Sequence, residues 1–152
     1  MLSDHALTRL SHAFGATGLR IVGKLNVPLY RLSGGRLMGK VGRAPVLLLT
    51  TTGRKSGQSR TAPVLYLADG ERLVVIGSNA GYERPPAWAL NLEAHPEAEA
   101  QVGSRRRAVR ARIAEGEERA DLWRRANAQY GGFEEYRERT DRRIRVFVLE
   151  PR

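Results

Sequence analysis

The 152-residue chain contains no cysteine and only three histidines, His5, His12 and His95. The absence of cysteine excludes disulfides and thiolate chemistry, and it suits a reducing compartment. Because the histidines are scattered, no cluster of histidine and carboxylate side chains predicts a metal site. No run of about 18 apolar residues occurs, and the N-terminus lacks the pattern of a signal peptide. We therefore expect a cytoplasmic protein, either soluble or attached peripherally to the inner face of the cell membrane.

Acidic residues are scarce in the first part of the chain. Residues 1–62 hold seven Arg and three Lys against Asp4 alone, which places +9 of the formal net charge of +10 in this part. Such an asymmetry predicts an acidic partner, which would be a polyanionic small molecule, an anionic membrane surface or nucleic acid. The alternative is a biased use of arginine without any partner, since 23 of the 26 basic residues are Arg. That alternative explains the total charge better than its uneven distribution.

Hydrophobic periodicity predicts six strands and three short helices after residue 45. The strands are expected at residues 46–52, 61–68, 72–78, 98–102, 105–113 and 144–148. The helices are expected at residues 88–94, 115–130 and 133–139. Hairpin connections without a repeated strand–helix–strand unit favour an α+β (mainly β) fold, an antiparallel barrel-like sheet with peripheral helices. The length predicts a single domain over residues 1–152.

The first 25 residues are expected to form an N-terminal helical segment. Ser3 can cap a helix there, and one face of that helix would be apolar through Ala6, Leu7, Leu10 and Phe14. The helix would either pack on the core or lie on an anionic membrane surface. A glycine-rich link over residues 33–42 would then lead into the strands.

Five arginines fall between residues 105 and 112. They resemble a nucleic-acid surface, but neighbouring residues on a strand point to opposite faces, so they do not form one patch. We expect an edge strand that is protected from aggregation by its charge.

A glycine-bounded basic turn interrupts the apolar run that starts at residue 45. Gly53 and Gly57 permit positive φ and would let backbone N–H groups approach a ligand. Charged and hydroxyl donors lie within and just after the turn, namely Arg54, Lys55, Ser56 and Arg60. This pattern predicts a hairpin tip that binds a phosphate or a carboxylate.

Two further segments carry candidate site residues. The small residues at 77–81 suit a close approach to a flat ring or a phosphate, whereas Trp88 and Asn91 would share one face of a short helix. Tyr130, Phe133 and Tyr136 recur at helical spacing around a Gly-Gly pair, which is typical of core packing and also of a mobile aromatic lid.

Residues 26–151 resemble the deazaflavin-dependent nitroreductase family of actinobacteria. The most specific segment is Thr-Thr-Gly-Arg-Lys-Ser-Gly at residues 51–57. Further matching positions are Arg60, Pro63, Asp69, Gly70, Ser78, Pro86, Ala87, Trp88, Asn91, Leu92, Pro96, Glu117, Glu118, Arg119, Ala120, Trp123, Tyr130, Tyr136, Thr140, Asp141 and Arg142. The resemblance implies a split β-barrel with coenzyme F420 in a groove, and hydride transfer from the reduced deazaflavin to a quinone, a nitroaromatic or another conjugated electrophile.

The resemblance also implies roles for individual residues. The phosphate and oligoglutamate tail of F420 would lie on Arg54, Lys55, Ser56, Gly57 and Arg60. The deazaflavin ring would be lined by Thr61, Ala62, Pro63, Ile76, Gly77, Ser78 and Asn79. The pocket would be closed by Trp88, Ala89 and Asn91. Ser78 would orient the acceptor, with Tyr130 and Tyr136 as walls or proton donors.

The chain departs from the family pattern mainly where the electron acceptor would bind. Leu65 stands where some quinone- and nitro-reducing members carry a tyrosine, Asn79-Ala80 replaces a more usual Lys-Gly, and Phe133 lacks a hydroxyl found in some relatives. Leu65 and Phe133 are therefore the expected substrate-pocket residues. An FMN- or haem-binding split barrel, or a non-catalytic binder of a polyanionic cofactor or anionic lipid, remains an alternative. We also consider a homodimer, and we expect neither nucleic acid nor a metal as partner.

Overall fold

The computed structural model describes residues 27–41, 44–78, 84–138 and 143–152. The expected N-terminal helical segment and Asn79 lie outside the described residues, and so does the side chain of Tyr136.

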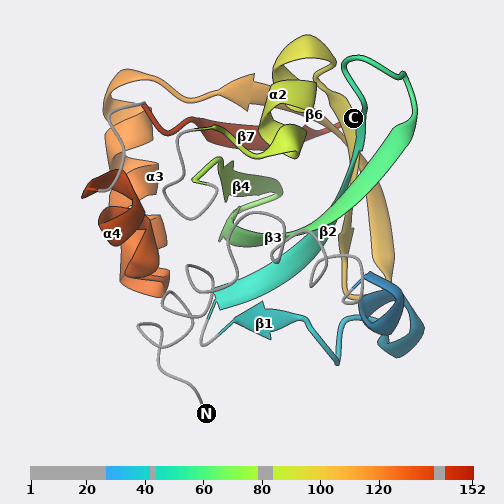
Figure 1. The fold of residues 1–152 in the computed structure, drawn as a ribbon. Helices are drawn as coiled ribbons and strands as arrows, with labels where there is room; N and C mark the ends of the chain where they lie inside the picture. Colours follow the sequence, from blue (N-terminus) through green and yellow to red (C-terminus); the bar gives the residue numbers. More distant parts are fainter. Residues whose placement is uncertain (1–26, 42–43, 79–83, 139–142) are drawn as a thin grey trace.

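Within these residues six antiparallel strands close a barrel (Figure 1). Their bounds are β2 (Ala44–Thr52), β3 (Ser59–Asp69), β4 (Arg72–Ile76), β5 (Glu97–Val102), β6 (Arg105–Ile113) and β7 (Val146–Pro151). The strands pair in the order β2-β3-β4-β7-β6-β5, and β5 pairs back onto β2 to complete the circle. A two-residue strand, β1 (Lys40–Val41), pairs with the start of β2. The predicted fold class, an α+β, mainly β antiparallel barrel, is confirmed.

Short helices cover the barrel on several sides. They are residues 27–33, α2 (Ala87–Ala94), α3 (Gly116–Gln129) and α4 (Gly132–Glu138). Figure 1 shows α2 over one end of the barrel, α3 and α4 together along one side, and the helix at residues 27–33 near the end opposite α2. No helix among the described residues is long and apolar enough to cross a membrane.

Side chains alternate along the strands between two apolar clusters. On β4, Leu73 and Val75 join the cluster inside the barrel, whereas Val74 and Ile76 pack in the cluster beneath α3. This period of two is the geometry of an extended strand. Each fully buried side chain of this kind contributes about 1.5–3 kcal/mol to folding. The helix α2 supplies Ala89 to the interior cluster and so closes one end of the barrel.

A single buried phenol holds the other end. The Tyr30 hydroxyl donates to the carbonyl oxygen of Val46 at 2.9 Å and accepts the Gly103 N–H at 2.9 Å. Gly35 has a φ of +83°, and a Cβ there would lie 2.8 Å from the Cα of Gly103, so the chain passes too close for a side chain. The described part of the predicted link, residues 33–41, is therefore anchored to the barrel through Gly35 and includes β1.

The edge-strand prediction for residues 105–112 is wrong. β6 pairs with β5 on one side and with β7 on the other, because the barrel is closed. Three of its five arginines pair with carboxylates: Arg110 with Glu97, Arg106 with Glu99 at 3.9 Å, and Arg112 with Glu118 and Glu150.

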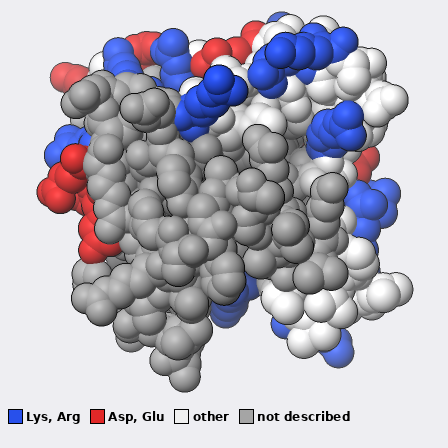
Figure 2. Space-filling view, in the orientation of Figure 1, with Lys and Arg blue, Asp and Glu red and all other residues white. Residues whose placement is uncertain are grey.

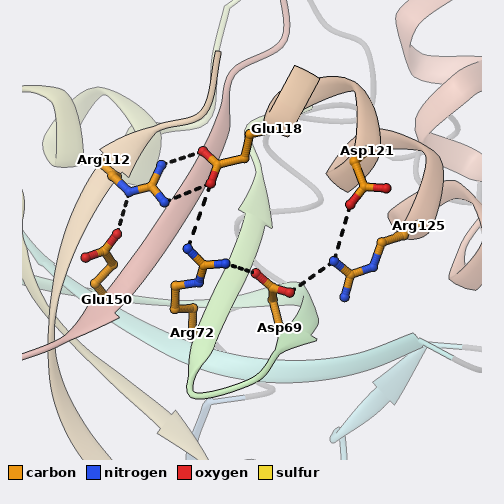
Figure 3. Close-up of polar contacts among 7 residues, drawn as sticks. All are labelled: Asp69, Arg72, Arg112, Glu118, Asp121, Arg125 and Glu150. Atoms are coloured by element: carbon orange, nitrogen blue, oxygen red, sulfur yellow. Dashed lines mark hydrogen bonds and ion pairs between the residues drawn. The ribbon is translucent and has the colours of Figure 1, made fainter. Parts of the chain in front are cut away.

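Seven charged residues form a continuous network that fastens α3 to the barrel (Figure 3). Arg112 donates two hydrogen bonds to Glu118 on α3, and Arg72 pairs with both Glu118 and Asp69. Arg125 on α3 donates to Asp69 at 3.0 Å. The two ends of the network are Glu150, bound by Arg112, and Asp121, which lies beside Arg125. Two turns of α3 are thus tied to the β3–β4 turn and to β6.

The network predicts a stability that falls in acid. The hydrogen bond from Arg125, with that from Arg72, lowers the pKa of Asp69, and the hydrogen bonds from Arg112 lower the pKa of Glu118. Because both folded-state pKa values are depressed, the contribution is present above the unfolded pKa of about 4 and is lost as the pH falls through the folded values. Urea unfolding at pH 7 and at pH 3 measures this loss.

The variant Asp69→Asn should be less stable by about 1 kcal/mol at pH 7 and should lose less stability between pH 7 and pH 3. Glu71→Gln, in the same turn but outside the network, is the matched control. Equal pH dependence for Asp69→Asn and the unchanged protein would show that Asp69 does not carry the effect.

Candidate functional site

The basic turn is a compact loop that closes on itself at the end of β2. The Gly53 N–H donates to the carbonyl oxygen of Gln58 at 2.8 Å, and the Gly57 N–H donates to that of Gly53 at 2.8 Å. Gly57 adopts a φ of +71°, which glycine permits without strain. A Cβ at Gly53 would lie 2.6 Å from the Ser56 hydroxyl oxygen, so this glycine allows the loop to fold back.

The backbone donors of this loop are mostly used inside the protein. The Gln58 N–H donates to the Ser56 hydroxyl at 3.2 Å, and the Arg54 N–H donates to the side-chain oxygen of Asn91 at 3.1 Å. With the two glycine bonds, four of the six N–H groups from Gly53 to Gln58 already have partners. The expectation that backbone N–H groups would face an anion therefore holds at most for Lys55 and Ser56. The charge must come chiefly from side chains.

Three basic side chains project from the loop and the strand that follows it. Arg54, Lys55 and Arg60 are all exposed. On the face drawn in Figure 2, blue side chains occur along the right-hand side, where Figure 1 places the β2–β3 hairpin, and red ones are more frequent over α3 and α4. An exposed group of three cations suits a ligand with more than one negative charge.

The barrel is split beside this loop. Tyr66–Asp69 of β3 pair with β4, whereas residues 59–65 pair with β2 alone among the described strands. Continuing the β3–β4 register would bring residues 76–78 opposite residues 63–65, but there the pairing stops. Of the residues expected to line the ring, Pro63 and Ala62 lie on the part of β3 that has no β4 partner, and Gly77 and Ser78 lie on the chain that follows β4.

Small residues let α2 pack close to the chain that borders this gap in the strand pairing. A Cβ at Gly77 would lie 3.3 Å from the Cβ of Ala89, so α2 packs directly on the chain after β4. The Gly77 N–H donates to the carbonyl oxygen of Arg145 and the Ser78 N–H to that of Ile76, both at 2.9 Å, which fixes this segment. Ser78 itself is 7% exposed.

The remaining ring and pocket residues lie at the edge of the interior cluster. Trp88 is half-buried, with its ring edge-on to Phe147 at 5.8 Å between centroids. Thr61 and Thr50 share a hydrogen bond between their hydroxyl groups at 2.9 Å, which joins β3 to β2 next to the loop. The sequence did not single out Thr50, because only the register shows that it faces Thr61.

The expected substrate residues belong to the cluster beneath α3. Leu65, Ile76 and Phe133 line one hollow of about 10 Å³, room for roughly one water molecule. Tyr130 is 3% exposed, and its ring lies edge-on to Phe133 at 5.2 Å. Leu65 and Ile76 lie both at this hollow and at the gap in the strand pairing, because the β3–β4 pairing ends just before them, at Tyr66 and Val75.

Among the described residues, no group of three or more histidine and carboxylate side chains could hold a metal ion. The arrangement has an exposed cationic loop, a gap in the strand pairing bordered by small and apolar residues, and a water-sized hollow beneath α3. It suits a flat ring with an anionic tail.

Comparison with known proteins gives the family. The profile of the F420H(2)-dependent quinone reductases matches residues 22–151. The chain belongs to this family.

One related sequence and two solved structures support this family assignment. The Mycobacterium tuberculosis protein Rv3178, provisionally named an F420H(2)-dependent quinone reductase, is 42% identical over 71% of this chain and 91% of its own length. A solved F420-H2 dependent reductase, FDR-A, is 36% identical with a TM-score of 0.65, over 70% of this chain and 94% of the other. A structure described as a domain-swapped dimer is 31% identical with a TM-score of 0.68, over 84% and 95% of the two chains.

The position of Tyr130 can be tested through the glycine beside it. A Cβ at Gly132 would lie 2.6–2.8 Å from two ring carbons and the hydroxyl oxygen of Tyr130, so Gly132→Ala must displace the phenol. We expect this variant to lose about 1–3 kcal/mol of stability, measured by urea unfolding, through overpacking.

Gly131→Ala is the matched control, since nothing lies within 4 Å of a Cβ at that position. Its stability should stay within about 0.5 kcal/mol of the unchanged protein. Equal losses in the two variants would mean that the Tyr130 ring does not rest on Gly132.

Proposed function

We propose that this chain is an F420-dependent oxidoreductase that reduces a quinone, a nitroaromatic or another conjugated electrophile. The observation that carries the proposal is the group of exposed cations, Arg54, Lys55 and Arg60, at the mouth of the split in the barrel. F420 has a phosphate and several carboxylates on its tail, whereas FMN has one phosphate. Three cations exceed what one phosphate requires, and this favours F420 over FMN.

The residues around the split fit the rest of such a cofactor. Gly77 and Ala89 carry no bulky side chains, so α2 packs directly on the chain after β4 and holds Trp88 and Ser78 near one another in the fold. Ala62 and Pro63 supply the opposite side, and Trp88 adds an aromatic wall. Reduced F420, when bound, supplies hydride from C5 of its deazaflavin ring.

The chain itself contributes orientation and exclusion of water. We assign Ser78 the task of binding the carbonyl or nitro oxygen of the acceptor through its hydroxyl. Leu65 and Phe133 would line the apolar side of the acceptor site, which must widen from the water-sized hollow that they line in this structure. Tyr130 and Tyr136 are assigned as walls or proton donors. Because Leu65 and Phe133 have no hydroxyl, the acceptor's proton would come from a different group than in relatives with tyrosines there.

A fluorescence titration with F420, beside FMN at the same salt concentration, tests this function. Lys55→Ala combined with Arg60→Ala should weaken F420 binding by about tenfold or more, since each lost charge-assisted contact costs about 1 kcal/mol or more. Both side chains are exposed, so the stability of the variant should be unchanged.

Arg105→Ala combined with Arg124→Ala removes the same charge from exposed positions outside the loop and is the control. Unchanged F420 affinity in the loop variant, or a preference of the unchanged protein for FMN, would contradict the proposal.

Two further properties are part of the proposal. A homodimer is supported by the dimeric relative of 31% identity. Contact with an anionic membrane through the N-terminal segment is supported by the residues that follow it, where the apolar side chains Leu29, Leu32, Leu37 and Met38 are exposed, Leu32 by 87%. Arg31 and Arg36 are exposed among them, a mixture that suits a lipid surface.

Vesicle sedimentation tests the membrane contact. The protein should sediment with vesicles containing phosphatidylglycerol and much less with pure phosphatidylcholine. Leu32→Asp combined with Leu37→Asp should reduce the bound fraction severalfold, because charged side chains cannot enter the lipid interface. Equal binding to both kinds of vesicle, or no effect of the variant, would remove this part of the proposal.

A further inference from the structure

The side chain of Asn91 joins α2 to the cationic loop. It is 3% exposed, its oxygen accepts the Arg54 N–H at 3.1 Å, and its nitrogen donates to the Thr51 hydroxyl at 3.1 Å. Both groups of the amide are therefore used for contacts with β2 and the loop, over sequence separations of 37 and 40 residues. These two bonds leave one N–H and one lone pair of the amide, but at 3% exposure the side chain presents little surface to a ligand.

The bond to Arg54 reaches the loop where it leaves the strand. Thr51 still pairs with β3 in regular register, and two residues later Gly53 closes the loop through its bond with Gln58. Arg54 is the first residue beyond that closure, and its N–H has no carbonyl partner in the loop. Asn91 supplies the missing acceptor from a different element, so the direction in which the chain leaves β2 depends on α2.

The same helix also carries the aromatic wall of the split. Trp88 and Asn91 lie three residues apart on α2, and Ala89 between them packs on Gly77. Asn91 therefore fixes the distance between the loop that would bind the tail and the helix that would bind the ring. We propose that Asn91 is a positioning residue that holds the cationic loop in register with the ring site, and that it does not contact the cofactor. This inference rests on the proposed F420 function and departs from the direct contact that the family resemblance implied.

The positioning role predicts a loss confined to the anionic part of the ligand. Asn91→Leu, of similar volume, removes both hydrogen bonds. F420 affinity should fall by about tenfold, whereas the affinity for the deazaflavin riboside, which lacks the phosphate and the glutamates, should change by less than about twofold. Equal losses for the two ligands would mean that Asn91 contacts the ring and would overturn the inference.

A double-mutant cycle adds a readout that a general loss of stability would not move. When Lys55→Ala and Arg60→Ala are already present, Asn91→Leu should have little further effect on F420 affinity, because the cations it positions are gone. Additive losses would contradict the inference. Asn127→Leu is the matched control: Asn127 likewise accepts a backbone N–H, from Glu134, and donates to a backbone carbonyl, but at the α3–α4 junction. This control should leave F420 affinity unchanged.

Amide exchange measured by NMR on the protein without ligand separates this inference from the proposed function. The Arg54 N–H should exchange at least about tenfold faster in Asn91→Leu, and protection should return in Asn91→Asp, whose carboxylate can still accept it. If the unchanged protein fails to bind F420, the proposed function falls, and the Arg54 exchange rate alone decides the role of Asn91. An unchanged rate would overturn it. Should Asn91→Leu not fold, Thr51→Val frees the Asn91 amide from one anchor and should give the same pattern at smaller size.

Discussion

The pairing of β2 with two partners is the constraint on which the rest of this structure depends. β3 occupies one edge of β2, and β5 occupies the other through Leu48, Leu49 and Thr50. Because β5 stands at the far end of the strand order that starts with β2, its pairing with β2 closes the sheet into a barrel, and the inward side chains form one interior cluster. Closure also removes the exposed edges that an open sheet of this length would have to protect. The arginines of β6 are consequently available for ion pairs with α3 and β7.

Closure is incomplete at one place, and the candidate site lies there. β3 is 11 residues long and β4 only five, so the two strands cannot pair along their whole length. The half of β3 that has no β4 partner, residues 59–65, follows directly from the cationic loop. The chain that leaves β4 packs against α2 at Gly77. A mismatch of strand lengths thus leaves a gap in the pairing of the barrel, with exposed cations at one end of the gap and small residues on its borders. The hydrogen bonds of Asn91 and the Thr50–Thr61 pair hold its borders in place.

The sequence predicted the elements whose signals are local. Alternating apolar residues and turn glycines located the hairpins to within a few residues, and β7 was displaced only slightly, from 144–148 to Val146–Pro151. β1 was missed because glycine-rich sequence reads as a link. The helix at residues 27–33 was missed because it is short and its anchor, Tyr30, bonds to residues 16 and 73 positions away. The partners of Asn91 and the network around Asp69 were missed for the same reason. Spacing along a chain shows which residues share one face of an element, but it does not show which distant residues that face contacts.

The distribution of ion pairs bears on whether the excess of arginine has a purpose. Every ion pair between described residues falls after residue 68, where Arg112, Arg125 and their neighbours meet the chain's own carboxylates. A general preference for arginine accounts for that part, because most of the described arginines there pair with the chain's own carboxylates. It does not account for Arg54, Lys55 and Arg60, which are exposed on one hairpin and have no carboxylate of the described chain beside them. Like charges held close together on a small loop repel one another, and a fold that keeps them there gains stability when an anion binds. The loop therefore has the electrostatics of a site for a polyanion rather than of an ordinary solvated turn.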